Sequence, residues 1–284
     1  MAIEFEKKLG GQVLAETLIE LINEGLDIVT IENDLRFTFT NQVREAFPDR
    51  FVEAGISEAN SIGLAAGMSE AGMIPVVHSL TPFITRRCYD QIVISIQYSG
   101  LHVKLIGTDP GIYSQMNGGT HLGIEDVSIM RAIPNMLIIS PVDNTALKAL
   151  VTQAMKDERS AYIRISRKLS RVVYHEGATF EIGKANTVRE GTDLTIIAND
   201  LMVAWSILLQ VIDPGAQAHH AQVAERFHRR DAAVIPHVLQ DLHPLGHLLR
   251  PRRGIEYAQL LTVHFPAPPM ICFSSIASLI TMSL

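Results

Sequence analysis

The chain has 284 residues, of which 47% are hydrophobic and 19% are charged, and its formal net charge is −6. This length allows one large domain or two ordinary domains with a substantial core. The negative balance, with no basic block in the sequence, gives no support to nucleic-acid binding. The two cysteines, Cys88 and Cys272, lie far apart in sequence, form no metal motif and require no oxidising compartment.

The composition of the two ends bears on targeting. The start, "MAIEFEKKLGG", lacks the basic and apolar regions of a signal peptide. The apolar final segment, "MICFSSIASLITMSL", is shorter than the roughly 18 residues that a spanning helix needs. We therefore expect a cytoplasmic protein without a membrane anchor.

Helix and strand patterns alternate along the first part of the chain. Helical periodicity or helix-forming composition predicts helices at 12–24, 41–47, from Ser57 onward, and at 86–100, 123–133 and 144–157. Short apolar runs predict strands at 27–34, at the start of 51–71, and at 74–80, 102–107, 136–140 and 161–166. Such alternation implies parallel pairing and right-handed crossovers. The predicted fold class is α/β, a three-layer domain around a parallel sheet.

Several polar residues follow these predicted strands directly. They are Asp34, Glu58 and the glycine-rich loop from Thr108 to His121. Ligands of open parallel sheets bind beyond the carboxyl ends of the strands. We expect these residues to share one edge of the sheet.

The helix that opens at Ser57 has an acidic residue in its first turn and a face of small residues that includes two glycines. Ser57 suits the cap position, and the helix dipole favours the negative charge of Glu58 in the first turn. Gly63 and Gly67 each cost roughly 1 kcal/mol against alanine in a helix. Two such glycines suggest that another part of the structure comes close to this face.

The regular pattern fails after about Gln210. Segment 181–209 reads as the opening of a second α/β domain, with a strand at 194–198 and the start of a helix. The tail has no lysine but holds seven of the eleven histidines and seven of the thirteen prolines, and no helix or strand period persists. The sequence predicts a domain at 1–171, a linker and the start of a second domain at 172–209, and a poorly ordered tail at 210–284, for which a frame-shifted C-terminus is one hypothesis.

Four motifs occur in one order and spacing: "GISEANSIGLAAGMSEAGMIPVV", "RCYDQIVISI", "GGTHLGIEDVSIMRAIPNM" and "YIRISR". Together they resemble the pyrimidine-binding domain of transketolases, which use thiamine diphosphate. The resemblance covers about 26–167 and continues weakly to about residue 204. The third motif favours transketolase over the β subunits of 2-oxoacid dehydrogenases, which share the "ISEA" motif.

The resemblance implies roles for five residues. Glu58 matches the glutamate that hydrogen-bonds a ring nitrogen of the cofactor's aminopyrimidine, and Phe83 matches an aromatic residue against that ring. Asp34 matches an aspartate near the cofactor and the subunit boundary. His121 matches the histidine that contacts the donor sugar and shuttles its hydroxyl proton. Arg167 matches an arginine that grips the sugar phosphate, for which a guanidinium is well shaped. Without the motifs, these residues would read as ordinary cap, core or surface residues.

Other positions depart from the family pattern. Leu80 stands at a cofactor-binding position that usually carries a second aromatic residue, and Arg86 stands where some members carry a tyrosine. Asp109 replaces a histidine of the sugar loop. Asn117 replaces the acidic residue that recognises a substrate hydroxyl, and Gly119 replaces a proline. We expect intact cofactor activation and altered sugar recognition.

The sequence contains nothing that resembles the diphosphate-binding domain of the family, whose ligands hold Mg²⁺. We therefore expect the C-terminal subunit of a split transketolase, in a heterodimer or heterotetramer whose partner subunit holds Mg²⁺ and the cofactor diphosphate. Such an enzyme transfers a two-carbon ketol unit between a ketose and an aldose or their phosphates, as in pentose phosphate metabolism. The alternatives are the β subunit of a 2-oxoacid dehydrogenase and a catalytically silent remnant or assembly partner.

Overall fold

The computed structural model describes residues 4–35, 40–190, 194–212, 218–222 and 272–273. The chain divides into two compact units. One unit is Glu4–Ile182, and the other consists of Met1–Ile3 and Gly183–Leu284.

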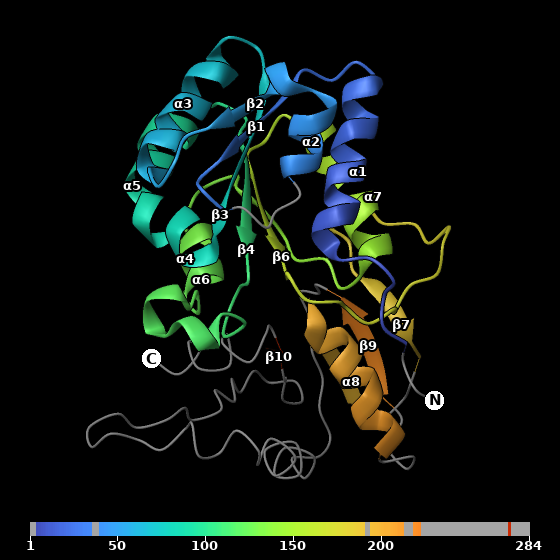
Figure 1. Cartoon of the computed structure of the whole chain (residues 1–284). Helices are drawn as coiled ribbons and strands as arrows, with labels where there is room; N and C mark the ends of the chain where they lie inside the picture. Colours follow the sequence, from blue (N-terminus) through green and yellow to red (C-terminus); the bar gives the residue numbers. More distant parts are fainter. Residues whose placement is uncertain (1–3, 36–39, 191–193, 213–217, 223–271, 274–284) are drawn as a thin grey trace, which may run out of the picture. The chain divides into compact units, whose positions relative to one another are not determined.

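The first unit is built around a six-stranded parallel sheet with the order β2-β1-β3-β4-β6-β5 (Figure 1). The inner strands are apolar runs that are buried almost throughout, as expected where helices cover both faces of a parallel sheet. The prediction of a three-layer α/β domain is confirmed. The strands are β1 (Ile28–Glu32), β2 (Phe51–Glu53), β3 (Ile74–Leu80), β4 (Lys104–Thr108), β5 (Leu137–Ile139) and β6 (Ala161–Ile165).

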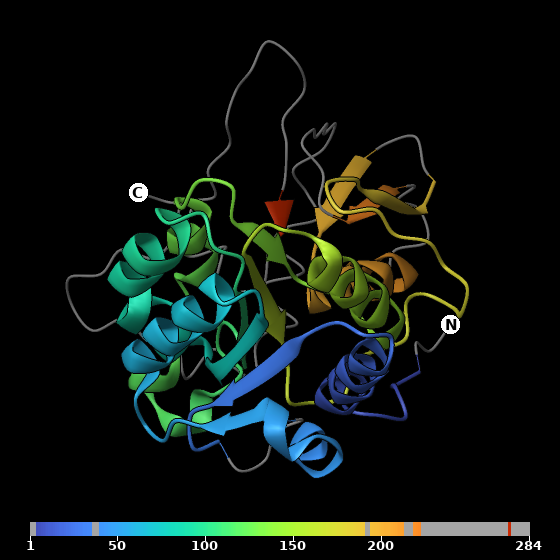
Figure 2. The ribbon, with the colours of Figure 1, turned by 90° about the horizontal axis from the view of Figure 1, so that it is seen from above.

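Helices form the two outer layers (Figure 2). One face of the sheet carries α1 (Gly10–Asn23), α2 (Thr40–Ala46) and α7 (Asn144–Lys156). The other face carries α3 (Glu58–Glu70), α4 (Thr81–Ile84), α5 (Tyr89–Gln91) and α6 (Asp126–Arg131). Short 3-10 helices lie at Pro48–Arg50, Arg86–Cys88, Gln115–Asn117 and Gly119–His121.

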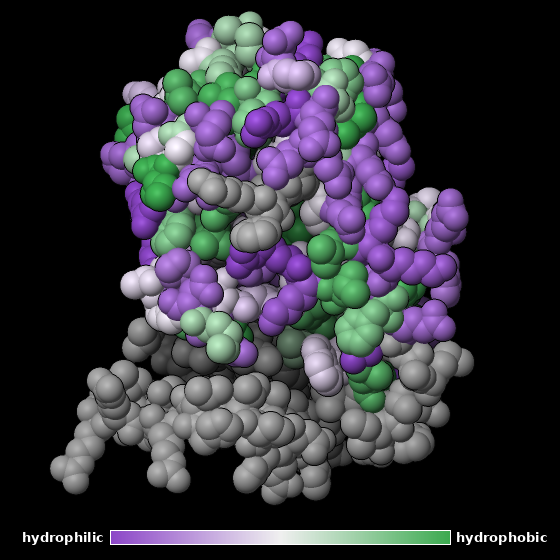
Figure 3. All heavy atoms as spheres, in the orientation of Figure 1, coloured by the Kyte–Doolittle hydropathy of each residue, from purple (hydrophilic) through white to green (hydrophobic). Residues whose placement is uncertain are grey.

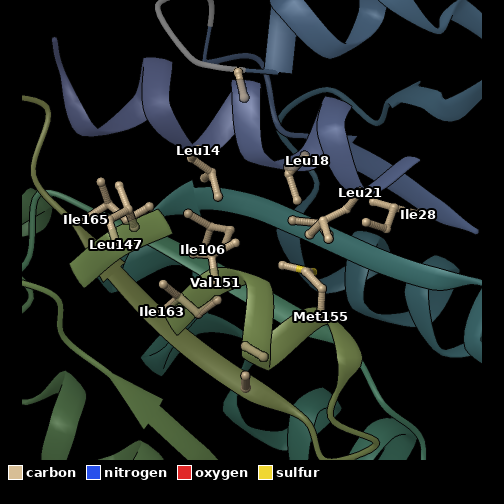
Figure 4. Packing of buried hydrophobic residues seen from close by; sticks show 14 of the residues in the cluster. Leu14, Leu18, Leu21, Ile28, Ile106, Leu147, Val151, Met155, Ile163 and Ile165 are labelled. Carbon is tan, nitrogen blue, oxygen red and sulfur yellow. The ribbon is translucent and has the colours of Figure 1, made fainter. Parts of the chain in front are cut away.

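The core under α1 follows from the periodicity of its sequence. Leu14, Leu18 and Leu21 recur at helical spacing. They point toward Ile106 of β4 and Val151 of α7 (Figure 4). Full burial of each leucine contributes about 1.5–3 kcal/mol. Hydrophilic residues cover the outer side of α1 (Figure 3).

The segment predicted as one helix at 86–100 is interrupted in the structure. It consists of the 3-10 turn Arg86–Cys88, the short α5 and a π-helical segment at Ile92–Gln97. Ile92 and Ile96 still reach the core on the α3 side. Helical periodicity alone does not distinguish α from π turns, because the wider turn changes the spacing by only one residue.

The second unit contains a four-stranded sheet with the order β10-β8-β9-β7. The strand predicted at 194–198 is present as β8 (Leu194–Ala198), and the helix after it is α8 (Leu201–Ile212). Strand β7 is Asn186–Arg189, whereas β9 (Ala218–Gln222) and β10 (Cys272–Phe273) lie in the tail, where the sequence pattern predicts no element. Strand β9 pairs with both β8 and β7. The rest of the tail predicted to be poorly ordered lies outside the described residues.

Within the described part of the chain, no helix combines the length and the apolar character needed to cross a membrane.

Candidate active site

The carboxyl ends of the parallel strands lie level at one edge of the sheet. Leu80 at the end of β3 pairs with Thr108 at the end of β4, and Thr108 pairs with Ile165 at the end of β6. Strand β1 ends at Glu32, which lies opposite Glu53 at the end of β2 and opposite His78, two residues before the end of β3. The strand ends after which the polar residues follow therefore do share one edge.

Glu58 is the first residue of α3 and is only 4% exposed. The turn before it passes through Gly55, whose φ of 69° favours glycine. Ser57 occupies the cap position, but its hydroxyl donates to the carbonyl oxygen of Ala54 over 2.7 Å and accepts no bond from the helix. Ser57 thus lies at the predicted cap position, but its side chain does not bond the helix N-terminus.

Two side chains bind the Glu58 carboxylate. The Ser79 hydroxyl donates to Oε1 over 3.2 Å, and Nη1 of Arg87 donates to Oε2 over 2.8 Å. Ser79 is fully buried, whereas the Arg87 side chain is 45% exposed. One carboxylate oxygen therefore faces the sheet, and the other faces the surface.

Aromatic contacts link Glu58 to the loop that carries His121. The guanidinium carbon of Arg87 lies 4.0 Å from the centre of the Phe83 ring. The Phe83 ring meets the His121 ring edge to face, with 5.1 Å between their centres. The structure thus brings together three of the sequence-predicted residues, Glu58, Phe83 and His121, with Arg87 between the first two.

The position of His121 depends on Arg86 and on α4. Arg86 donates to the carbonyl oxygens of Thr120 and Leu122 over 3.2 and 3.4 Å, and it forms an ion pair with Glu125 at 2.7 Å. A Cβ atom on Gly123 would lie 2.2 Å from Cγ2 of Thr81, so the loop packs directly on the start of α4. Arg86 therefore fixes the backbone on both sides of His121.

Three further sequence-predicted residues differ in their exposure. Leu80 is 4% exposed and occupies the cap position of α4, the helix that carries Phe83. Asp34 is exposed at the end of β1, where its backbone N–H donates to Oε1 of Glu53 over 3.0 Å. Asn117 is exposed in a turn on the loop before His121. Leu80 is thus buried at the start of α4, whereas Asp34 and Asn117 lie at the surface.

Arg167 and Asp109 form a second polar group at the ends of β6 and β4. Nε and Nη2 of Arg167 lie 2.8 and 2.6 Å from Oδ2 of Asp109, and the backbone N–H of Arg167 donates to Oδ1 over 3.0 Å. The Ser114 hydroxyl also donates to this carboxylate. The guanidinium predicted to grip a sugar phosphate is thus paired with a carboxylate of the same chain.

The sequence reasoning missed a buried polar chain between β1 and Glu58. Nδ1 of His78 lies 3.0 Å from both carboxylate oxygens of Glu32, and Nε2 lies 3.2 Å from the Thr108 hydroxyl. Thr108 in turn donates to the carbonyl oxygen of Ser79, the residue that binds Glu58. The signal in the sequence was a glutamate and a histidine inside otherwise apolar strands, since charged residues are rarely fully buried without partners.

Arg87 was missed as well, although its spacing from Phe83 is informative. The two residues are four positions apart, which places their side chains on one side of a helical turn. Cys88 beside Arg87 is buried, and its thiol lies 3.1 Å from the carbonyl oxygen of Phe83. Burial, and then the charge of Glu58, raise the pKa of the Cys88 thiol to about 12, so this group is not a nucleophile at neutral pH.

A metal site needs several ligands close together. Over the described ranges, no group of three or more histidine, cysteine, aspartate or glutamate side chains is placed to hold a metal ion.

Comparison with protein families gives one match that covers more than half of the chain. The family described as "Transketolase, pyrimidine binding domain" matches residues 9–172. This range contains Glu58, Phe83, His121 and Arg167.

Individual relatives agree with this match. The 6-deoxy-6-sulfo-D-fructose transketolase subunit SqwH of Clostridium sp. (strain MSTE9) is 41% identical over 209 residues, which cover 72% of this chain and 65% of the relative. One of the subunits of apulose-4-phosphate transketolase from Phocaeicola vulgatus is 33% identical over 207 residues, which cover 72% of this chain and 66% of the relative. The chain therefore spans less than two thirds of the length of either relative.

A similar solved structure is described as "Split gene transketolase, inactive beta4 tetramer". It is 32% identical, with a TM-score of 0.69, over 76% of this chain and 70% of its own. Transketolase from Leishmania mexicana has the same fold at 19% identity, with a TM-score of 0.64 over 78% of this chain and 35% of its own.

Proposed function

Because the chain belongs to the transketolase family through its pyrimidine-binding domain, we propose that it is the C-terminal subunit of a split transketolase. The assembled enzyme would transfer a two-carbon ketol unit from a ketose to an aldose, or between their phosphates. The observation that carries this proposal is the grouping of the buried Glu58 with Phe83 and His121 at the carboxyl edge of the sheet. Relatives described as transketolase subunits support the division into two chains.

The residues of this edge fit the aminopyrimidine of thiamine diphosphate, the cofactor that the family implies. Glu58 offers a carboxylate oxygen on its surface side, and Phe83 offers an aromatic face beside it. A planar group with N–H donors, the guanidinium of Arg87, already lies against both of them. When bound, thiamine diphosphate supplies a carbon nucleophile and an electron sink.

The protein's own part of the reaction is to orient groups and to move protons. Glu58 would bind a ring nitrogen of the cofactor through Oε2 while Ser79 holds Oε1 in place. His121 would contact the donor sugar and carry its hydroxyl proton. Nδ1 of His121 already lies 2.8 Å from the Thr120 hydroxyl, which leaves Nε2 to face a substrate.

We assign the diphosphate and Mg²⁺ to a partner subunit, in a heterodimer or heterotetramer. Magnesium prefers an octahedral set of oxygen ligands, and the described residues provide no cluster of this kind. Asp34, exposed at the end of β1, would lie near the cofactor and the boundary with the partner.

We also propose a donor sugar outside the common pentose and hexose phosphates. Arg167 would face the far end of the substrate, but Asp109 compensates its charge, and Asn117 stands where an acidic residue would recognise a hydroxyl. The names of two relatives specify 6-deoxy-6-sulfo-D-fructose and apulose 4-phosphate, which supports unusual substrates for subunits of this kind.

The test combines the chain with a diphosphate-binding subunit and titrates thiamine diphosphate and Mg²⁺ by calorimetry. We expect binding and ketol transfer in the mixture and neither with the chain alone. Glu58→Ala should abolish turnover and leave partner binding largely intact, whereas Glu24→Ala on the outer surface should change neither. Normal turnover of Glu58→Ala would refute the proposed role of this carboxylate, and acyl transfer to lipoamide would instead identify a 2-oxoacid dehydrogenase.

A second candidate is an inactive assembly of this chain with itself. The relative described as an inactive beta4 tetramer favours this possibility. A tetramer of the chain in solution that neither binds the diphosphate-binding subunit nor turns over substrate would support it.

A further inference from the structure

The guanidinium of Arg87 lies at the point where two of the proposed cofactor contacts meet. Nη1 of Arg87 donates to Oε2 of Glu58 over 2.8 Å, and the guanidinium carbon lies 4.0 Å from the centre of the Phe83 ring. Glu58 and Phe83 are the residues to which the proposed function assigns the aminopyrimidine ring. The arginine therefore contacts the same two groups as the ring would.

A guanidinium and an aminopyrimidine offer such a site similar chemistry. Both are planar, both carry N–H donors that suit a carboxylate oxygen, and both stack on an aromatic face. The ion pair with Arg87 also compensates the buried charge of Glu58, which would be costly to leave unpaired. The pairing thus stabilises the carboxylate in the position that the cofactor would need.

The guanidinium and the aminopyrimidine would compete for the same oxygen of Glu58. Oε1 of Glu58 faces the fully buried Ser79, and Oε2 faces Arg87. Glu58 is 4% exposed, and the partly exposed Arg87 side chain covers Oε2, so a ligand that approaches this oxygen from the surface meets the Arg87 guanidinium. We propose that Arg87 is a further residue of the cofactor site, whose guanidinium is displaced from Glu58 and Phe83 when the aminopyrimidine binds. This proposal rests on the proposed function.

The side chain can leave without a change in the fold. Arg87 lies on the 3-10 turn Arg86–Cys88, and its side chain is 45% exposed. The backbone around it is held by the N–H of Cys88, which donates to the carbonyl oxygen of Thr85 over 3.1 Å. The movement therefore involves side-chain torsions alone.

The experiment measures the dissociation constant of thiamine diphosphate with Mg²⁺ by calorimetry on the chain reconstituted with its diphosphate-binding subunit. Arg87→Met removes the competing charge and donors, so the cofactor should bind roughly three- to tenfold more tightly. Arg87→Lys keeps the ion pair and should bind like the wild type. The matched control is Arg44→Met. Arg44 lies on α2, and its guanidinium lies over the ring of Phe51. Helix α2 packs on the face of the sheet opposite to the one that carries α3 and α4.

The outcomes separate this proposal from the one on which it rests. The role of Arg87 would be overturned if a folded Arg87→Met complex bound the cofactor as tightly as the wild type or more weakly. The proposed function would remain intact in that case, provided that the wild type binds the cofactor and Glu58→Gln does not. No binding by any of the complexes would overturn both. If Arg87→Met does not fold, Arg87→Gln, which keeps a neutral donor for Glu58, is measured with the same expectation of tighter binding.

Discussion

The carboxylate of Asp109 accepts two hydrogen bonds from Arg167, one from its backbone N–H and one from Nε, and Nη2 of the same guanidinium lies 2.6 Å from Oδ2 as an ion pair. Asp109 has a φ of 54°, a conformation that aspartate and asparagine tolerate better than most residues. The charge of Arg167 is therefore compensated within the chain itself. A substrate that ends in a dianionic phosphate would meet the Asp109 charge at the same place.

Asp109→Asn tests this effect on the substrate site that we propose around Arg167. Asparagine keeps the backbone conformation and an acceptor oxygen but removes the negative charge next to Arg167. We expect the KM for a phosphorylated donor to fall by roughly three- to tenfold, as for the loss of one partly exposed charge. Asp157→Asn, which breaks an aspartate–arginine pair with Arg159 elsewhere, is the matched control. An unchanged or higher KM for Asp109→Asn would contradict this account of Arg167.

Lys104 at the start of β4 gives a pH-dependent prediction. Its side chain is fully buried, its ammonium donates to the carbonyl oxygens of Asp157 and Arg159, and burial lowers its pKa from 10.5 to about 8. Between these two values the unfolded chain binds more protons than the folded chain, so the free energy of unfolding rises with pH. The full rise would be at most about 3 kcal/mol.

Urea unfolding of the wild type and of Lys104→Met at a series of pH values isolates this contribution, because the other titrating groups are common to both proteins. The wild type should gain stability relative to Lys104→Met as the pH increases from 8 to 10. A difference that stays constant or falls over this range would show that Lys104 is not the cause.

At the scale of the elements, the loop that carries His121 is fixed by its close approach to α4. A Cβ atom at Gly123 would lie 2.2 Å from Cγ2 and 2.9 Å from Cβ of Thr81, which is fully buried. Gly123→Ala should therefore lower the free energy of unfolding by about 1–3 kcal/mol and reduce turnover by displacing His121. Thr81→Ser removes the nearest atom and should restore part of the loss. Equal stability of Gly123→Ala and the wild type would contradict this packing.

The sequence predicted the elements of the first unit more closely than it predicted their contacts. The strand predicted at 74–80 has the same bounds as β3, because a continuous apolar run between turn residues is a strong signal. The π-helical segment at Ile92–Gln97 was not predicted, since the four-residue spacing of its buried residues Ile92 and Ile96 is compatible with both an α turn and a π turn. Strand β9 was missed because its residues, "AHHAQ", show no apolar alternation.

The candidate site shows the same difference between position and contact. The motifs selected Glu58, Phe83 and His121, and parallel topology explains why residues after the strands meet at one edge. The partners of these residues could not be predicted, because Arg87, Arg86 and Ser79 approach them from other segments. Such distances depend on the twist of the sheet and on side-chain packing, which a pattern of residue types does not encode.

At the scale of the whole molecule, helix α3 presents two glycines that nothing in the described chain covers. A Cβ atom at Gly63 or Gly67 would meet no atom within 4 Å. The prediction that something comes close to this face is therefore not explained by the described part of the chain itself. A partner subunit is the proposed neighbour.

Each of the variants Gly63→Ala and Gly67→Ala should then stabilise the folded chain but weaken its assembly with the partner. In the chain alone, each should raise the free energy of unfolding by about 0.5–1 kcal/mol, because alanine favours the helix and the space is open. In the complex, the added methyl groups should weaken partner binding if the helix packs closely. Asn23→Ala on α1 serves as the control for helix propensity. Stabilised chains that assemble normally would exclude α3 from the interface.

The order of the strands also has a consequence for how the chain folds during synthesis. In the described sheet, β5 lies at the edge beside β6, which follows it in the chain with α7 between them. Likewise, β4 pairs with β3 on one side, and its other side is paired only after β6 has been synthesised. Closing such long loops makes folding slow. Asp109 and Arg167 meet only when β6 has joined β4, so a ribosome-bound chain that ends before β6 lacks this ion pair and the substrate site proposed around it.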